Sequence, residues 1–238
     1  MIVEVLFSEF YTYGEIENVR YLAKMLKGVD FIYTSYDNEP YFVNNDVDML
    51  VIEPMAEHYL AMVCDKLKPF KTRLQTMIDD GVYFFIVNNA MDIFGRTLKL
   101  SDGKELDTLG LLDYETIRNY DKRYAYLFVA KYQDIEICAN NTGFSTYCIP
   151  DKYHLYSVEL NGIKASDIEL SGYHKHNVYA IEFLSHFFIM NPLISKKILA
   201  HFGIDESLPF EQEALESYNH QLKLFKNDAK LLKHYQSK

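Results

Sequence analysis

Two segments of the sequence place polar or charged side chains directly after short apolar runs. Asn88-Asn89-Ala90 follows the run 81–87, and Glu53-Pro54-Met55 follows the run 49–52. If both runs are parallel strands of one sheet, the two segments lie at its carboxyl edge, where open α/β sheets hold their ligands. A sharp turn from a strand into a helix is also where such folds place a nucleophile. These segments are therefore the first candidates for a functional site.

Other residues could supply acid, base or metal-binding groups. Glu53, Asp92 and His186 could donate or accept protons at the same pocket, although a packed or capping role is favoured for His186. His174 and His176 could bind a metal through alternate residues. Because no cysteine or carboxylate cluster accompanies these histidines, a solvated loop is favoured, and we expect no metal and no cofactor.

Composition and charge narrow the class of protein. The chain has 238 residues, of which 49% are apolar and 24% charged, as in folded globular proteins. The net charge of -10 argues against general binding to nucleic acid or to an anionic membrane. Three widely spaced cysteines predict no disulfide framework and a reducing cytoplasm, and Cys64 is expected to be a small buried residue.

Targeting and membrane signals are weak. The N-terminal segment 1–10 carries acidic residues where a secretory signal needs basic ones. The most apolar stretch, 178–194, is interrupted by Glu182, His186 and Pro192. It is too broken for a membrane helix, so we expect a cytoplasmic protein without membrane insertion.

The first half of the chain predicts alternating strands and helices. Strands are expected over 2–7, 31–34, 49–52 and 81–87, and helices over 14–27 and 56–80, the latter interrupted at Pro69. Short strands without alternation are typical of sheets covered on both faces. We therefore predict an α/β fold: a three-layer, mostly parallel, flavodoxin-like sheet with helices on both faces.

The second half predicts an antiparallel extension and a helical end. The turn Ser101-Asp102-Gly103 indicates a hairpin within 97–109. Further strands are expected over 124–130, 134–139, 158–163 and 177–184, and helices over 192–202 and 209–238. The last helix is amphipathic, and packing on its own domain or docking on a partner are equally open. We find no linker and predict one domain over 1–238.

Taken in order, several segments resemble the class I glutamine amidotransferases, in particular the CobB/CobQ-like branch. That branch includes the glutaminase subunit of lipid II isoglutaminyl synthase and the amidotransferase domain of cobyric acid synthase. The resemblance runs from Tyr13 to about Phe202. Its parts are Tyr13-Gly14 with Asn18 (the family's YGDxGN), 81–95 (its strand, elbow and helix), Leu109-Gly110-Leu111-Leu112 (GLGLL), Ala139-Asn140-Asn141 (FEN), and 180–184 with Asn191-Pro192 (its second catalytic strand and loop).

The family's catalytic residue types are not present at the matching positions. The resemblance implies a Cys nucleophile where Asn88 stands and a His where Leu184 stands. The oxyanion loop corresponds to Glu53-Pro54-Met55, and the glycines after the Cys correspond to Asn89 and Ala90.

These replacements remove what the family's reaction needs. A carboxamide is a poor nucleophile, and leucine transfers no proton. Proline donates no N–H, and Glu53 would place negative charge near a developing anion. His186, two residues after Leu184, would share its strand face if the strand continued that far. Asn also tolerates the positive φ of an elbow. We therefore interpret the chain as a pseudo-amidotransferase with a vestigial site.

Three functions remain open. The first is a structural or regulatory subunit beside a Mur ligase-like ATP-dependent partner, in cell-wall or related amide-forming metabolism. The second is an enzyme with altered hydrolase or amidotransferase chemistry at the same pocket. The third is a sensor of a small glutamine-like amide. We favour the first.

Overall fold

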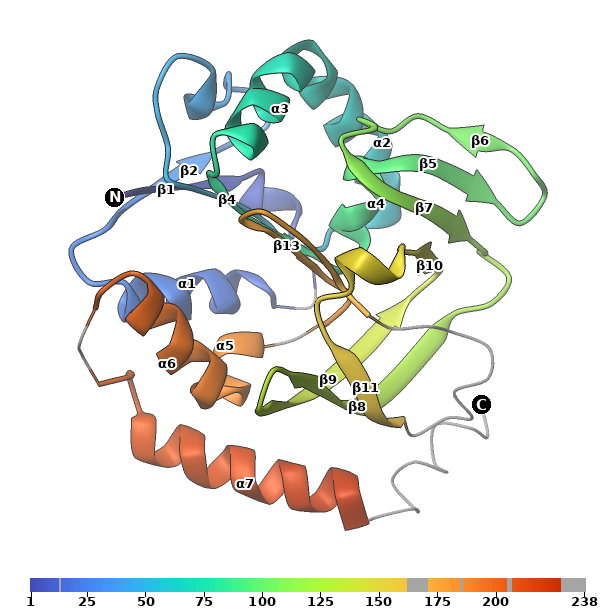
Figure 1. The fold of residues 1–238 in the computed structure, drawn as a ribbon. Coiled ribbons are helices and arrows are strands. Elements are labelled where there is room, and N and C mark those ends of the chain that lie inside the picture. Colours follow the sequence, from blue (N-terminus) through green and yellow to red (C-terminus); the bar gives the residue numbers. More distant parts are fainter. Residues whose placement is uncertain (13, 162–170, 185, 205–206, 228–238) are drawn as a thin grey trace.

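The computed structural model describes residues 1–12, 14–161, 171–184, 186–204 and 207–227. A six-stranded sheet, ordered β12-β13-β4-β3-β1-β2, forms its centre (Figure 1). The strands are β1 (Ile2–Leu6), β2 (Asp30–Thr34), β3 (Met49–Ile52), β4 (Tyr83–Val87), β12 (Tyr173–Lys175) and β13 (Val178–Ile181). All neighbours pair in parallel except β12, which is an antiparallel edge strand. This order confirms the predicted flavodoxin-like sheet.

Helices cover both faces of the sheet, which gives three layers (Figure 1). One face packs on α1 (Ile16–Met25), α5 (Phe187–Met190) and α6 (Pro192–His201), and the other on α2 (Glu57–Leu67), α3 (Lys71–Asp79) and α4 (Met91–Phe94). In β3, Leu50 and Ile52 face the second group of helices, whereas Met49 and Val51 face the first. Burial on both faces explains why this strand shows no alternation.

Pro69 separates α2 from α3 as predicted. A short 3-10 turn over Lys68–Phe70 joins the two helices, with Pro69 at its first turn. Proline lacks the N–H that a continuous helix would need there.

The middle of the chain forms two smaller sheets. The first, ordered β10-β7-β5-β6, contains β5 (Gly95–Leu100), β6 (Glu105–Leu106), β7 (Leu112–Arg118) and β10 (Ser145–Cys148). The second contains β11 (Ser157–Asn161), β8 (Tyr124–Tyr132) and β9 (Ile135–Gly143), which all pair in antiparallel fashion. The predicted hairpin is confirmed as β5 and β6. Positions 162–163 of the predicted strand 158–163 lie outside the described residues.

The predicted antiparallel extension is present in the middle of the chain, and within it β5 and β7 form a parallel pair. The segment between them returns the chain to the start of β5. Its backbone N–H groups at Leu109, Gly110 and Leu111 donate to the carbonyls of 93–95, at 2.7, 3.1 and 3.0 Å. Gly95 is required at this crossing, since a Cβ there would lie 2.7 Å from the Tyr114 ring. β7, β10, β12 and α5 were not anticipated from the sequence.

The helix α7 (Glu211–Asn227) packs on its own domain. Tyr218 and Phe225 bury their rings against Val129 of β8 and Cys138 of β9. The Tyr218 hydroxyl donates to the Glu136 carbonyl at 2.9 Å. The rest of the predicted helix, 228–238, lies outside the described residues. Nowhere in the described ranges is a helix both long and apolar enough to cross a bilayer.

Candidate functional site

The turn after β4 has the backbone of an elbow. Asn88 directly follows Val87, has φ 50°, and begins a short 3-10 turn that leads into α4. A positive φ is costly for most residues with a side chain, and asparagine is among those that adopt it most readily. The positive φ expected at this position is therefore observed.

The Asn88 side chain is fixed by the protein itself. Its Nδ2 donates to Asn141 Oδ1 at 2.9 Å and to the Glu182 carbonyl at 2.8 Å. Its own backbone carbonyl accepts a hydrogen bond from the Tyr147 hydroxyl at 3.0 Å. Both amide hydrogens are thus engaged, and the residue is only 4% exposed.

Asn89 joins the two segments that the sequence singled out. Its Oδ1 accepts from the Met55 N–H at 3.1 Å, and its Nδ2 donates to the Met55 carbonyl at 2.6 Å. The backbone donor of Met55 is therefore already occupied. The neighbouring Pro54 has no N–H, and its carbonyl accepts from the Thr12 N–H at 3.0 Å. The structure thus brings 53–55 and 88–89 together, and hydrogen bonds within the protein engage the polar backbone groups of Pro54 and Met55.

Glu53, the first residue of the segment 53–55, is completely buried. Its Oε1 accepts from Asn18 Nδ2 at 2.8 Å, and its Oε2 has no hydrogen-bond partner among the described residues. Burial, reinforced by the negative charge of Glu15, raises the pKa of Glu53 well above its usual value, while the Asn18 hydrogen bond opposes this. The surroundings of Glu53 therefore disfavour the negative charge that the sequence places at this position.

Asp92, which the sequence offered as an acid or base, lies in a buried ion pair. Its carboxylate forms a buried ion pair with Arg118 and accepts from Ser145 Oγ at 2.7 Å. Burial disfavours the charged form of Arg118. The attraction and hydrogen bond of the Asp92 carboxylate outweigh this effect and hold the Arg118 pKa above its ordinary value. Asp92 therefore fastens α4 to β7 and β10, and its assignment to an altered site is not supported.

Leu184 and His186 do not share a strand face, because β13 ends at Ile181. Leu184 is buried, and its N–H donates to the Asn140 carbonyl at 2.9 Å. His186 is exposed and precedes α5, with its carbonyl accepting from the Met190 N–H at 2.9 Å. The condition under which His186 could replace a base at position 184 is therefore not met.

Of the two histidines expected in a solvated loop, His176 lies in an exposed turn, whereas His174 does not. His174 lies in β12, half-buried, with its ring stacked 4.6 Å from that of Tyr179. Burial lowers the pKa of His174. His176 occupies the turn to β13 with φ 54°. Across the described ranges, no group of three or more His, Cys, Asp or Glu side chains is arranged to hold a metal ion.

Sequence reasoning missed Glu182, which anchors the other side of the elbow. Its buried carboxylate accepts from the Tyr156 hydroxyl and, at 3.0 Å, from the Gly172 N–H. Burial raises the pKa of Glu182, and the Tyr156 hydrogen bond opposes that shift. The signal was available, because Glu182 is the acidic residue of an otherwise apolar run from 178 to 184.

Two of the three cysteines are buried, and the third points away from the elbow. Cys64 is buried in α2, as expected, and burial raises its pKa to about 11. Cys138 is buried in β9, and burial raises its pKa to about 12. Cys148 is exposed on β10. Its neighbour Tyr147 is the residue that reaches Asn88, and side chains alternate along a strand, so Cys148 points the other way.

Comparison with known proteins identifies the fold. No protein-family model matches the sequence, and no curated protein matches it. A solved glutamine amidotransferase matches with a TM-score of 0.57 and 10% identity, over 84% of this chain and 99% of that chain. A glutamine amidotransferase from Thermotoga maritima matches with a TM-score of 0.53 and 12% identity, over 99% and 94%. The chain therefore has a glutamine amidotransferase-like fold.

Proposed function

We propose that this chain is a glutamine amidotransferase-like protein that has no glutaminase activity and acts as a structural or regulatory subunit. Asn88 carries the proposal. It stands at the elbow where the sequence resemblance implies a cysteine, and its side chain donates to Asn141 and to the Glu182 carbonyl. A carboxamide has no lone pair of sufficient reactivity to attack an amide at neutral pH.

The surroundings of Asn88 support the same conclusion. Stabilising a tetrahedral oxyanion needs free N–H groups aimed at the reacting oxygen. In the loop after β3, the Met55 N–H is bound to Asn89 and Pro54 has none. The resemblance implies a catalytic base at position 184, and the Leu184 side chain cannot accept a proton.

The partner we propose is a Mur ligase-like ATP-dependent protein. The resemblance to the isoglutaminyl synthase subunit suggests it, because active relatives of that type pass ammonia to such a ligase. With the glutaminase reaction lost, free ammonia or another amine would supply the nitrogen. The pseudo-subunit would then stabilise or regulate the ligase, in cell-wall or related amide-forming metabolism.

The first experiment measures ammonia release from glutamine by the purified protein, alone and with co-purified proteins. We expect no turnover above buffer. The matched variants are Asn88→Ala, at the elbow, and Asn219→Ala, on the exposed face of α7. Turnover that Asn88→Ala abolishes and Asn219→Ala leaves intact would overturn the loss of activity and favour altered chemistry at this pocket.

The second experiment tests the subunit role. The full chain is tagged in its native cell, and proteins that co-purify at stoichiometric amounts are identified by mass spectrometry. We expect a ligase-like ATP-dependent protein whose ammonium-dependent amide formation increases when this chain is present. Recovery of the chain as an isolated monomer would contradict the proposal. A rise in Tm with glutamine, together with an isolated monomer, would favour the sensor instead.

A further inference from the structure

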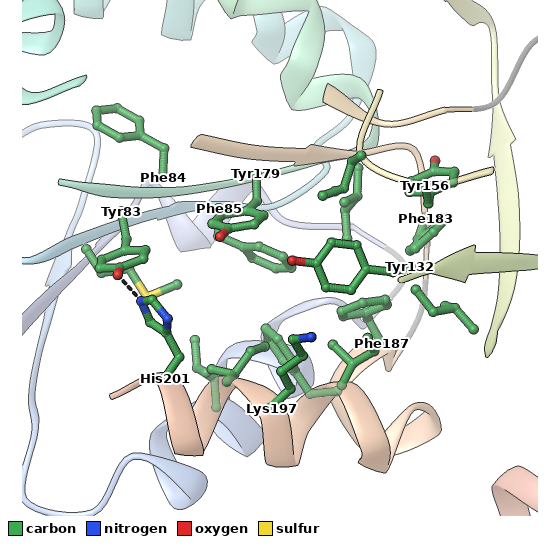
Figure 2. A pocket seen from close by; sticks show the side chains of 18 of the residues that line it. Tyr83, Phe84, Phe85, Tyr132, Tyr156, Tyr179, Phe183, Phe187, Lys197 and His201 are labelled. Atoms are coloured by element: carbon green, nitrogen blue, oxygen red, sulfur yellow. Dashed lines mark hydrogen bonds between the residues drawn. The ribbon is translucent and has the colours of Figure 1, made fainter. Parts of the chain in front are cut away.

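A cavity of about 150 Å³ lies between the sheet and the helices α5 and α6 (Figure 2). None of its lining residues belongs to the loop 53–55 or the turn 88–90. Figure 2 shows Tyr83 and His201 at one end and Phe183 and Phe187 at the other. Phe and Tyr account for 10 of its 19 lining residues, against 15% aromatic residues in the whole chain, and all of these rings except that of Phe84 lie on the cavity side of the sheet. An aromatic-lined space of this kind favours an aromatic ring, because ring edges and faces attract one another.

The strand register explains the aromatic lining. Tyr83 and Phe85 are two residues apart in β4 and therefore point to the same face of the sheet. Tyr179 and Ile181 do the same in the adjacent β13. Phe85 also packs against Phe188 of α5, with ring centroids 5.1 Å apart. The cavity is thus built from regular elements, and its shape is set by the sheet and not by a loop.

The mouth of the cavity is basic. Its charged or titratable lining residues other than tyrosine are Lys197 and His201, both exposed, and none is Asp or Glu. This contrasts with the whole chain, which has 34 acidic and 24 basic residues. The Lys197 ammonium lies 5.3 Å from the centre of the Tyr132 ring, and the Tyr83 hydroxyl is hydrogen-bonded to His201 Nε2. An apolar interior with a basic entrance suits an amphipathic anion.

We propose that this cavity binds a small aromatic carboxylate. Its ring would lie among Phe85, Phe183 and Phe187, and its carboxylate would meet Lys197 at the mouth. An engineered cavity of about this size in another protein takes up benzene, so a single six-membered ring fits the volume. Lys197 now contacts Gln133 Oε1, and its flexible stem lets the ammonium turn to a ligand. The inference is independent of the chemistry proposed for Asn88.

The test uses phenylacetate as the probe, titrated into the full chain by calorimetry and by ligand-observed NMR. We expect a Kd on the order of 1 mM, which is ordinary for about ten non-hydrogen atoms. Phenethylamine carries the same ring with a cationic end, and we expect it to bind at least about fivefold more weakly. Absence of phenylacetate binding at about 10 mM, or equal affinity for both probes, would refute the proposal.

Three variants assign the binding to this cavity. Ile198→Trp places a large ring in the cavity and is expected to abolish binding. Lys197→Glu reverses the charge at the mouth and should weaken phenylacetate binding about fivefold or more. Lys223→Glu makes the same charge change on the exposed side of α7 and should leave binding unchanged.

Lys197→Glu keeps the test decisive if Ile198→Trp fails to fold, because Lys197 is exposed and its replacement leaves the core intact. Phenylacetate affinity unaffected by Lys197→Glu, or lowered equally by Lys223→Glu, would show that the anion binds elsewhere and would overturn the proposal.

Discussion

Replacing Glu53 by glutamine is expected to stabilise the protein at neutral pH. Glu53 is completely buried, receives one hydrogen bond from Asn18, and has no partner for its second oxygen among the described residues. Glutamine has nearly the same shape as the neutral acid, and its Oε1 can accept the same hydrogen bond. The variant therefore keeps the neutral form while removing the ionisation.

The sign follows from the direction of the pKa shift. Burial and the charge of Glu15 raise the folded-state pKa of Glu53 above the usual 4.5. Below 4.5 both states hold the proton, so ionisation affects neither. Above it, the unfolded chain loses the proton while the folded chain keeps it, and the free energy of unfolding falls by about 1.4 kcal/mol per pH unit. The fall stops where pH reaches the raised folded-state pKa.

The measurement is urea unfolding at intervals from pH 5 to pH 8. The stability of Glu53→Gln minus that of the wild type should grow with pH, at up to about 1.4 kcal/mol per unit, before it levels off. The buried acids Glu4 and Glu182 are common to both proteins, so their pH dependence cancels. Glu213→Gln, on the exposed side of α7, is the control and should give a flat difference. A flat difference for Glu53→Gln would refute the reasoning.

Three further predictions concern other buried groups. Asp92→Asn should destabilise the protein by about 3–5 kcal/mol in urea unfolding, because it leaves a buried guanidinium without its charge partner; a loss under about 1 kcal/mol would contradict this. Asn88→Asp should cost about 3 kcal/mol at pH 7, since a carboxylate cannot donate to two acceptor oxygens, and an unchanged Tm would exclude that network. A thiol reagent at pH 8 should modify Cys148 first, with Cys64 and Cys138 reacting only on slow opening, as peptide mapping would show.

The central sheet was predictable because its strands depend on local signals. The run 49–52 is apolar throughout, since both of its faces are buried. Pro69 interrupts the helical region whatever its tertiary surroundings, because proline lacks the N–H that a continuous helix needs. By contrast β7 was missed. Its inward positions are Leu112, Tyr114, Thr116 and Arg118, and a buried arginine does not look like part of a core. Arg118 is buried because Asp92 pairs with it, and that pairing spans 26 residues of sequence.

The position of the candidate site was predictable from the sequence, but its hydrogen bonds and the pKa shift of Glu53 were not. The end of β4 and the loop after β3 could be located from strand spacing, and the positive φ of Asn88 from its residue type. The hydrogen-bond partners of Asn88 could not be predicted, because Asn141 and Glu182 lie 53 and 94 residues away in the sequence. The raised pKa of Glu53 is likewise a consequence of burial, which no pattern around position 53 reveals.

The proposed loss of reactivity at the elbow agrees with how the Asn88 side chain is held. A nucleophile must reach substrate, so its side chain has to be accessible. The Asn88 carboxamide is buried and donates to two protein oxygens, each bond contributing about 1 kcal/mol. Together they offset the cost of roughly 1–2 kcal/mol for a left-handed residue with a side chain. The turn therefore holds its shape through internal hydrogen bonds, and those bonds engage both amide hydrogens of Asn88.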